Sequence, residues 1–228
     1  MESQYERNFP AVSAEEQEIL RRKHVLVLGC GGLGGYLIEL LARLGVGRLT
    51  VVDGDGFEPS NLNRQLYSAP AVLGQSKAIT AAERVRAIAP NTVVKPVQAF
   101  FSEQNGDELV QGTDLVVDAL DNLPARLLLE DTCDRHNVPY VHGAILGWNL
   151  QVTTGLPGSR VLHGLYGGIS QQPTDDPVCK TSLSMTPAVC AGLQVAEALK
   201  LLTGRTPALA GKLLLLDLRT MEQRMITL

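Results

Sequence analysis

The glycine-rich run GCGGLG, residues 29–34, follows an apolar stretch and precedes a helical pattern. Glycines let a chain turn tightly and approach a phosphate closely, and a helix N-terminus favours the phosphate charge. Gly29, Gly31 and Gly32 are therefore candidate nucleotide-binding residues. Asp53 follows about 20 residues later, where a carboxylate can accept hydrogen bonds from ribose hydroxyls. These features alone fit a dinucleotide-dependent oxidoreductase as well as an enzyme that uses ATP.

Charged side chains further along the sequence distinguish a site for ATP from a site for a dinucleotide. A triphosphate carries about twice the charge of a dinucleotide pyrophosphate and needs cationic side chains and a metal. Arg64 offers a planar fork of donors, and Lys77 offers a compact positive charge. Asp118 and Asp121 stand in the run DALDN at the predicted carboxyl end of a strand, where a carboxylate can hold Mg²⁺. This set favours ATP with Mg²⁺.

Strands and helices alternate along the part of the chain that would position these residues. Helical patterns cover 13–23, 33–44, 75–89 and 124–136, and apolar strand patterns cover 24–28, 48–53, 92–99, 115–120 and 140–145. Alternation of this kind predicts an α/β fold: a Rossmann-like, doubly wound, mostly parallel sheet with helices on both faces. The strands are apolar almost throughout, as expected for a sheet buried on both faces.

The pattern changes after Gly147. Short strands are predicted at 151–156 and 161–163, a mobile loop at 164–178, a helix at 186–203, and a closing hairpin at 212–217 and 223–227. We therefore expect a single domain over 1–228. It comprises an N-terminal arm and helix (1–23), a nucleotide-binding core (24–146) and a C-terminal antiparallel extension (147–228).

Composition narrows the class of protein. The chain has 228 residues, of which 45% are hydrophobic, and this suits one domain with a well-filled core. Its formal net charge of -4 argues against nucleic-acid binding. No apolar run reaches the roughly 20 residues that span a bilayer, and the first ten residues lack a signal-peptide pattern. We expect a cytoplasmic protein that does not enter a membrane.

Five elements in this order resemble the ubiquitin-activating-enzyme-like adenylyltransferases, the ThiF/MoeB/HesA family. They are GCGGLG at 29–34, DGD at 53–55, NLNRQ at 61–65, GQSK at 74–77 and DALDN at 118–122. The resemblance covers nearly the whole chain. It implies that the protein adenylates the C-terminal carboxylate of a small ubiquitin-like sulfur-carrier protein, which often ends in Gly-Gly. The carboxylate attacks the α-phosphorus of ATP, and pyrophosphate leaves.

The resemblance also implies a role for each matching position. Gly32 lies against the nucleotide, Asp53 binds the ribose, and Asp121 serves Mg²⁺ and the reacting centre. The phosphate contacts fall to Asn61, Arg64, Gln65 and Lys77, and the matching runs add Asp55 and Asn122 to the nucleotide site. Taken singly, Asp55 and Asn61 could stabilise turns, and Asp118 could cap the following helix.

The segment YERN, residues 5–8, resembles the family's arm that reaches into a partner subunit. Asn8 stands where the family usually has glutamine. The resemblance implies a homodimer in which Arg7 supplies a positive charge in trans. Without it, Arg7 would be an ordinary residue of a disordered terminus.

The four cysteines, Cys30, Cys133, Cys179 and Cys190, include no C-x-x-C pair. Many family members bind zinc through two such pairs, so we expect no zinc here. Cys179 lies where some relatives carry a catalytic cysteine that attacks the acyl-adenylate, and Lys180 beside it could favour the thiolate. The alternative is an incidental thiol. No rhodanese-like extension is present, so we expect the sulfur donor to be a separate protein.

Two other functions remain compatible with the sequence. One is a dinucleotide-dependent oxidoreductase, which would give Arg64, Lys77 and Asp121 no role. The other is a non-catalytic subunit of an activating complex, which would not retain these charges. Within the family, the acyl acceptor could also be a peptide or a tRNA base, and the carrier and pathway stay open.

Overall fold

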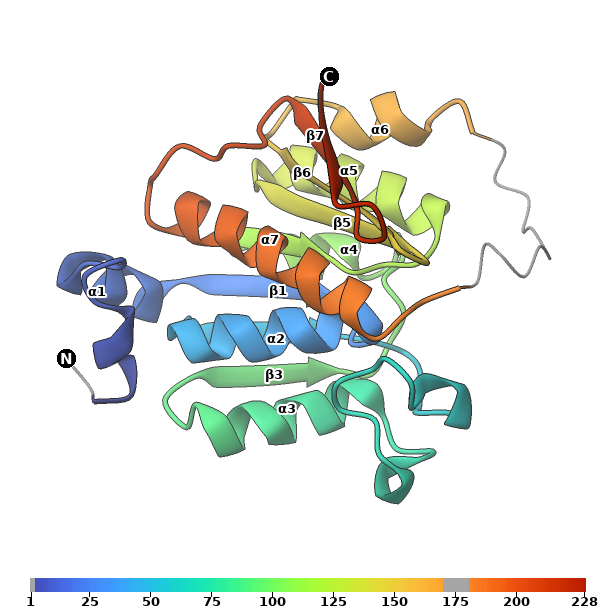
Figure 1. Ribbon diagram of the computed structural model, residues 1–228. Helices are drawn as coiled ribbons and strands as arrows, with labels where there is room; N and C mark the ends of the chain where they lie inside the picture. The colour runs from blue at the N-terminus through green and yellow to red at the C-terminus, as the bar shows by residue number, and fades with distance from the viewer. Residues whose placement is uncertain (1–2, 170–180) are drawn as a thin grey trace.

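The computed structural model describes residues 3–169 and 181–228, which form one eight-stranded sheet with helices on both faces (Figure 1). The strand order is β3-β2-β1-β4-β5-β6-β7-β8. The strands are β1 (His24–Leu28), β2 (Arg48–Val52), β3 (Val93–Val97), β4 (Leu115–Asp118), β5 (Tyr140–Leu146), β6 (Asn149–Gly155), β7 (Lys212–Asp217) and β8 (Glu222–Thr227). Strands β1 to β5 pair in parallel and β6 to β8 antiparallel, which confirms the predicted α/β fold and its antiparallel extension.

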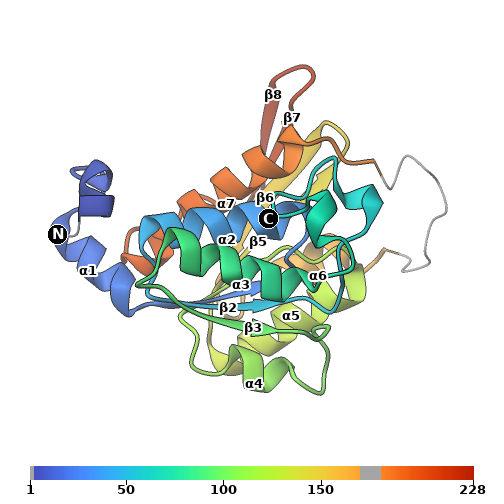
Figure 2. The same cartoon turned by 90° about the horizontal axis from the view of Figure 1, so that it is seen from below.

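The helices divide into two layers, which separate clearly when the molecule is seen from below (Figure 2). One layer packs α2 (Gly32–Leu44), α3 (Lys77–Ile88) and α7 (Met185–Leu202) on the sheet. The other contains α4 (Gly106–Val110), α5 (Leu123–His136) and α6 (Val161–Tyr166). The remaining elements are η1 (Ser3–Asn8), α1 (Ala14–Arg22), η2 (Pro59–Asn61) and η3 (Pro70–Val72).

The strand order reverses between β1 and β4. From β1 the chain builds outward through β2 and β3, and it then returns to place β4 on the other side of β1. The carboxyl ends of these parallel strands share one edge. Ligands of open α/β sheets bind at such a reversal, so the fold itself points to the edge where Gly29 and Ala119 follow β1 and β4.

Local signals in the sequence account for the helix ends. Ser13 accepts a hydrogen bond from the Glu16 N–H, and the Glu16 carboxylate accepts one from the Ser13 N–H, which together form the capping box of α1. Gly45 ends α2 in the left-handed conformation with φ of 85°. Between these ends, α2 buries Leu37, Ile38 and Leu41 completely.

Two local predictions differ from the structure. Residues 161–163, predicted as a strand, begin α6, which continues through Tyr166, so the first residues of the predicted loop are helical. The cause lies far away in the sequence: the buried Glu130 carboxylate accepts the N–H groups of Leu162 and His163 and so caps the helix. The short helix α4 was not predicted. Most of the loop predicted at 164–178 lies outside the described residues.

The C-terminal strands present two unlike faces. Helix α7 covers the face that contains Val152 and Leu214. This helix has the length and composition of a membrane span, but half of it is buried within the fold, as in the core helix of a globular domain. On the opposite face, Ala144, Gln151, Leu215 and Arg224 form one row across β5 to β8. Strand β8 closes the sheet and is exposed along its whole length.

Candidate active site

The glycine loop joins β1 to α2 and touches the turn that follows β4. Gly29 has φ of 97°, and a Cβ there would lie 2.6 Å from the Ala119 carbonyl oxygen. A Cβ on Gly34 would lie 1.9 Å from the Gly29 carbonyl oxygen. Both positions therefore need glycine for the fold itself.

Gly31 and Gly32 differ from these two. A Cβ on Gly31 would meet only the Gln65 side chain, at 3.6 Å, and one on Gly32 only the Arg64 side chain, at 3.5 Å. These are ordinary contacts, so the protein's own packing does not require glycine at either place. A helix N-terminus without a side-chain cap opens here, because α2 starts at Gly32 and Gly31 has no capping side chain. The result is a cradle suited to a phosphate.

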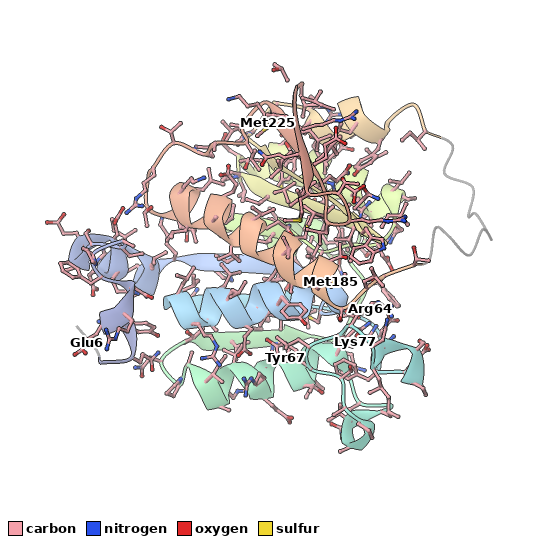
Figure 3. All side chains as sticks on the ribbon, in the orientation of Figure 1. Glu6, Arg64, Tyr67, Lys77, Met185 and Met225 are labelled. Carbon is pink, nitrogen blue, oxygen red and sulfur yellow. The ribbon has the colours of Figure 1, made fainter. Side chains whose placement is uncertain are left out.

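Arg64 and Gln65 reach this cradle from the segment after η2, and Figure 3 shows Arg64 at the glycine-loop end of α2. Arg64 Nη1 donates to the Ser60 carbonyl and to Asn63 Oδ1, both at 2.8 Å. Gln65 is buried, and its Oε1 has no hydrogen-bond partner. Asn61 is also buried, and its Oδ1 accepts the Glu58 N–H at 3.0 Å. Asn61 thus holds the segment that carries Arg64 and Gln65.

Two acidic residues follow β2. Asp53 accepts the N–H groups of Cys30 and Asp55, at 2.7 and 2.8 Å, and so ties the glycine loop to the end of β2. Burial raises the pKa of Asp53, against the effect of these two hydrogen bonds. Asp55 is paired with Lys77, whose Nζ lies 3.0 Å from its Oδ2. Lys77 is buried at the start of α3, so its charge is held at this edge.

Phe100 is a residue at this edge that sequence reasoning missed. Its ring lies against Gly54, where a Cβ would come within 2.8 Å of the ring atoms, and yet the side chain is 67% exposed. An exposed aromatic ring next to Asp53 is available to cover a purine base. Its contact with Gly54 joins residues 46 positions apart, and no motif in the sequence signals it.

Asp121 and Asn122 follow β4. Asn122 caps α5 by accepting the Ala125 N–H at 3.0 Å, and its Nδ2 lies 3.3 Å from Asp121 Oδ1. Asp121 is exposed, and its carboxylate offers hard oxygen donors of the kind Mg²⁺ prefers. Among residues 3–169 and 181–228, no three His, Cys, Asp or Glu side chains gather as a metal site.

Asp118, at the end of β4, is fully buried and held from both faces of the sheet. Its Oδ2 accepts from His142 Nδ1 at 2.6 Å, and its backbone carbonyl accepts from Gln194 Nε2 at 2.9 Å. Its Oδ1 accepts the Leu120 N–H, a local turn that ends the strand two residues earlier than predicted. His142 is thus a core residue with its hydrogen-bond partners in place. Arg126 and Tyr166, which also contact this group, were missed.

The N-terminal arm lies at the end of α2 that is opposite the glycine loop. Tyr5 is buried against Gly45, beyond the last residue of α2, and Arg7 is exposed. Helix α2 has 13 residues and so measures about 20 Å. Figure 3 shows Glu6 far from Arg64 and Lys77. Within one chain, therefore, Arg7 does not reach the glycine loop.

Three cysteines are buried and free: Cys30, Cys133 and Cys190. Burial raises the pKa of each thiol, so none of the three is poised as a thiolate. The prediction for Cys179 lies outside the described residues.

A groove of about 490 Å³ lies on the open face of the C-terminal strands. Its apolar floor includes Ala144 and Leu215, and its polar rim includes Asp217, Glu222 and Arg224. The groove also contains Gln151, whose side chain reaches back toward His142.

Comparisons with known proteins agree with this geometry. The model of the ThiF family matches residues 4–228. The chain is 41% identical to the SAMP-activating enzyme E1 of Haloferax volcanii, covering 90% of this chain and 77% of that protein. It is 37% identical to the sulfur carrier protein adenylyltransferase of Thermus thermophilus, over 96% of this chain and 83% of that protein. It covers about half the length of two longer relatives from Zea mays, 47% of one and 46% of the other.

Among solved structures, E. coli MccB with MccA-N7isoASN resembles the whole chain, with a TM-score of 0.85, 19% identity and 72% of that chain covered. At this identity the likeness shows the fold.

Proposed function

The chain belongs to the ThiF family and is similar to a sulfur carrier protein adenylyltransferase, and from that premise we propose that it adenylates a small ubiquitin-like sulfur-carrier protein. The carrier's C-terminal carboxylate attacks the α-phosphorus of ATP, the bond to the β-phosphate oxygen breaks, and pyrophosphate leaves. The product is a carrier acyl-adenylate.

One observation carries the proposal: Gly31 and Gly32 follow β1, Arg64 and Lys77 lie in the chain after β2, and Asp121 follows β4, so all come from segments at the carboxyl edge where the strand order reverses. Gly31 and Gly32 are glycines that packing does not need, which is expected if a phosphate takes the space. A dinucleotide-dependent oxidoreductase would leave the two cations and Asp121 without a role.

The chemical difficulty is charge. A carboxylate is ionised at neutral pH, so no general base is needed, but an anion must approach a polyanion. Arg64 and Lys77 would neutralise the phosphates, Gly31 and Gly32 would admit them to the helix N-terminus, and Asp53 would hold the ribose. Phe100 would cover the base. Mg²⁺ bound at Asp121 would supply further neutralisation of the phosphate charge.

The carrier would dock in the groove on the C-terminal strands. Leu215 and Ala144 offer an apolar floor, and Asp217, Glu222 and Arg224 a charged rim. A carrier with an apolar surface ringed by charge would fit, and its flexible tail would then run along the sheet toward Asp121. The extension 147–228 is thus proposed as the carrier-binding part.

Arg7 would act in a partner's site. Its own glycine loop is about 20 Å away, at the other end of α2. In such a homodimer, the N-terminal arm of each subunit would place its Arg7 in the nucleotide site of the other subunit. Mixing an Arg7→Ala chain with a Lys77→Ala chain would then restore activity, because one of the two sites in a mixed dimer is intact. Mixed dimers without activity would contradict it.

Later steps are also proposed. Cys179 would attack the acyl-adenylate, forming a thioester and releasing AMP, and a separate protein would deliver sulfur. We place these steps in the cytoplasm. A carrier adduct that is sensitive to thiols and absent from Cys179→Ser would support the covalent step, and an adduct unchanged in that variant would exclude it.

Pyrophosphate exchange into ATP tests the central proposal, with Mg²⁺ and small proteins ending in Gly-Gly, and with Lys77→Ala as control. Exchange that requires both a carrier and Lys77 supports adenylation. Tight ATP binding without exchange for any carrier or peptide would contradict it and favour a non-catalytic subunit.

A further inference from the structure

A chain of buried and partly buried hydrogen bonds connects the groove with the turn after β4. Gln151 Nε2 donates to the Tyr166 hydroxyl, and that hydroxyl lies 2.9 Å from His142 Nε2. His142 Nδ1 lies 2.6 Å from Asp118 Oδ2, and Asp118 Oδ1 accepts the Leu120 N–H at 2.8 Å. These residues come from α6 and three positions along the sheet.

Each donor in this hydrogen-bond chain has an acceptor only if the imidazole is neutral. His142 Nδ1–H then donates to the carboxylate, and Nε2 accepts from the Tyr166 hydroxyl, which itself accepts from Gln151. Burial lowers the pKa of His142, against the effect of the Asp118 carboxylate, which agrees with a neutral ring. The donor at one end, the Gln151 amide, and the acceptor at the other, the Asp118 carboxylate, therefore determine the proton positions along the hydrogen-bond chain.

Arg126 reinforces the same turn. Its Nη2 donates to the Leu120 carbonyl at 2.6 Å, and its guanidinium carbon lies 5.7 Å from the centre of the Tyr166 ring. The Tyr166 ring also packs edge-on against His142, with ring centres 5.6 Å apart. The N–H of Leu120 is thus held by Asp118, which His142 contacts, and its C=O by Arg126, which Tyr166 contacts.

Asp121 directly follows this turn, and its exposed carboxylate is placed by the backbone before it and by Asn122. We propose that Tyr166 and His142 are positioning residues that brace the 118–122 turn and so fix Asp121 relative to the groove. The inference rests on the proposed function for the role of Asp121. It explains why Gln151, a groove residue, shares a hydrogen-bond network with the nucleotide edge.

Tyr166→Phe tests the brace, and Tyr140→Phe is its matched control. Phenylalanine keeps the ring contacts with Arg126 and His142 and removes only the hydroxyl. Tyr140, on β5, belongs to the same hydrophobic cluster, and its hydroxyl donates a hydrogen bond to Glu130, away from the turn. Both variants are expected to lower the melting temperature similarly. A purely structural role for Tyr166 would predict nothing more.

Two readouts separate positioning from stability. In pyrophosphate exchange with saturating ATP and carrier, Tyr166→Phe should lower kcat about tenfold to a hundredfold with little change in KM for ATP, as expected for misplacement of a reacting-centre group. Tyr140→Phe should keep kcat near the wild-type value. In hydrogen–deuterium exchange of the full chain, peptides covering 119–123 should lose protection in Tyr166→Phe only.

Equal kcat and equal protection in the two variants would overturn the brace. If the wild-type chain exchanges no pyrophosphate with any carrier, the proposed function fails, and hydrogen exchange then decides the brace alone. Selective loss of protection at 119–123 would support it, and unchanged protection would refute it.

Discussion

At the carboxyl edge of β1 and β2, the backbone places the polar groups, whereas on the β5–β8 side of the sheet side chains place one another. The glycine loop is set by the close approach of Gly29 to Ala119, and Asp53 is held by two backbone N–H groups. Across β5 and α6, by contrast, His142 and Tyr166 depend on partners from distant segments. We therefore expect the backbone of the first region to depend less on exchanges of its side chains than the second region does.

The largest effect is expected at Lys77. Lys77→Ala removes a cation from the phosphate site, and exchange should fall by about 10²- to 10³-fold, as for other electrostatic donors. Its partner Asp55 is 54% exposed, so the loss leaves no buried charge and the fold should persist. The exposed Lys95→Ala is the control in the same assay. A tenfold or smaller loss for Lys77→Ala would show that backbone groups alone bind the phosphates.

Within the first region, two substitutions distinguish a glycine that the fold requires from a glycine that we expect the nucleotide to require. Gly34→Ala should destabilise the protein by about 3 kcal/mol, because its Cβ would overlap the Gly29 carbonyl. Gly32→Ala should leave thermal stability unchanged or slightly raised, since alanine favours a helix, and should weaken ATP binding. Thermal melts and ATP titration of both variants give the result. Unimpaired ATP binding by Gly32→Ala would mean that the cradle holds no phosphate.

A third test addresses the groove. Leu215→Glu should weaken carrier binding about tenfold, because a charge replaces part of the apolar floor. Met225→Glu, on the same hairpin but the opposite face of β8, should have little effect. Binding can be followed by the fluorescence of Trp148, the single tryptophan, which is 42% exposed between β5 and β6. Equal affinities in both variants would place the carrier elsewhere.

The smallest effect concerns pH. The Glu130 pKa lies below its ordinary value, because hydrogen bonds from Tyr140, His163 and two N–H groups outweigh the opposing effect of burial. This carboxylate stabilises the fold above about pH 4.3, its unfolded value, and the contribution is lost as pH falls through the lower folded value. Glu130→Gln should therefore lose less stability than wild type between pH 5 and 3.

Melting curves across this range, with the exposed Glu103→Gln as control, test the difference. Parallel curves for Glu130→Gln and wild type would exclude a role for the Glu130 charge. Asp53 acts in the opposite sense: its raised pKa means that the folded state gains relative to the unfolded chain as pH falls. Acidification should thus affect α6 before the glycine loop.

Sequence patterns predicted the sheet and most of its helices because short, continuously apolar strands alternate with longer helical patterns along the chain. They singled out Gly31, Arg64, Gln65, Lys77 and Asp121 because these lie in the motifs that carry the family resemblance. They missed α6, whose helix depends on Glu130, about 30 positions earlier, and gave a strand for its first turn. Arg126, Tyr166 and Phe100 escaped notice for the same reason, since only tertiary contacts give them meaning. The roles of the site residues themselves stay predictions.

Strand β8 has a consequence for solubility. It is exposed along its whole length and covers one edge of β7, which contains four consecutive leucines. An uncovered strand of that kind is a template for pairing with other chains, and aggregation follows. The charged pair of Glu222 and Arg224 on β8 presents a less adhesive border to solvent. We therefore expect β8 to keep the leucine-rich strand β7 from pairing with other chains at its edge, apart from anything it contributes to carrier binding.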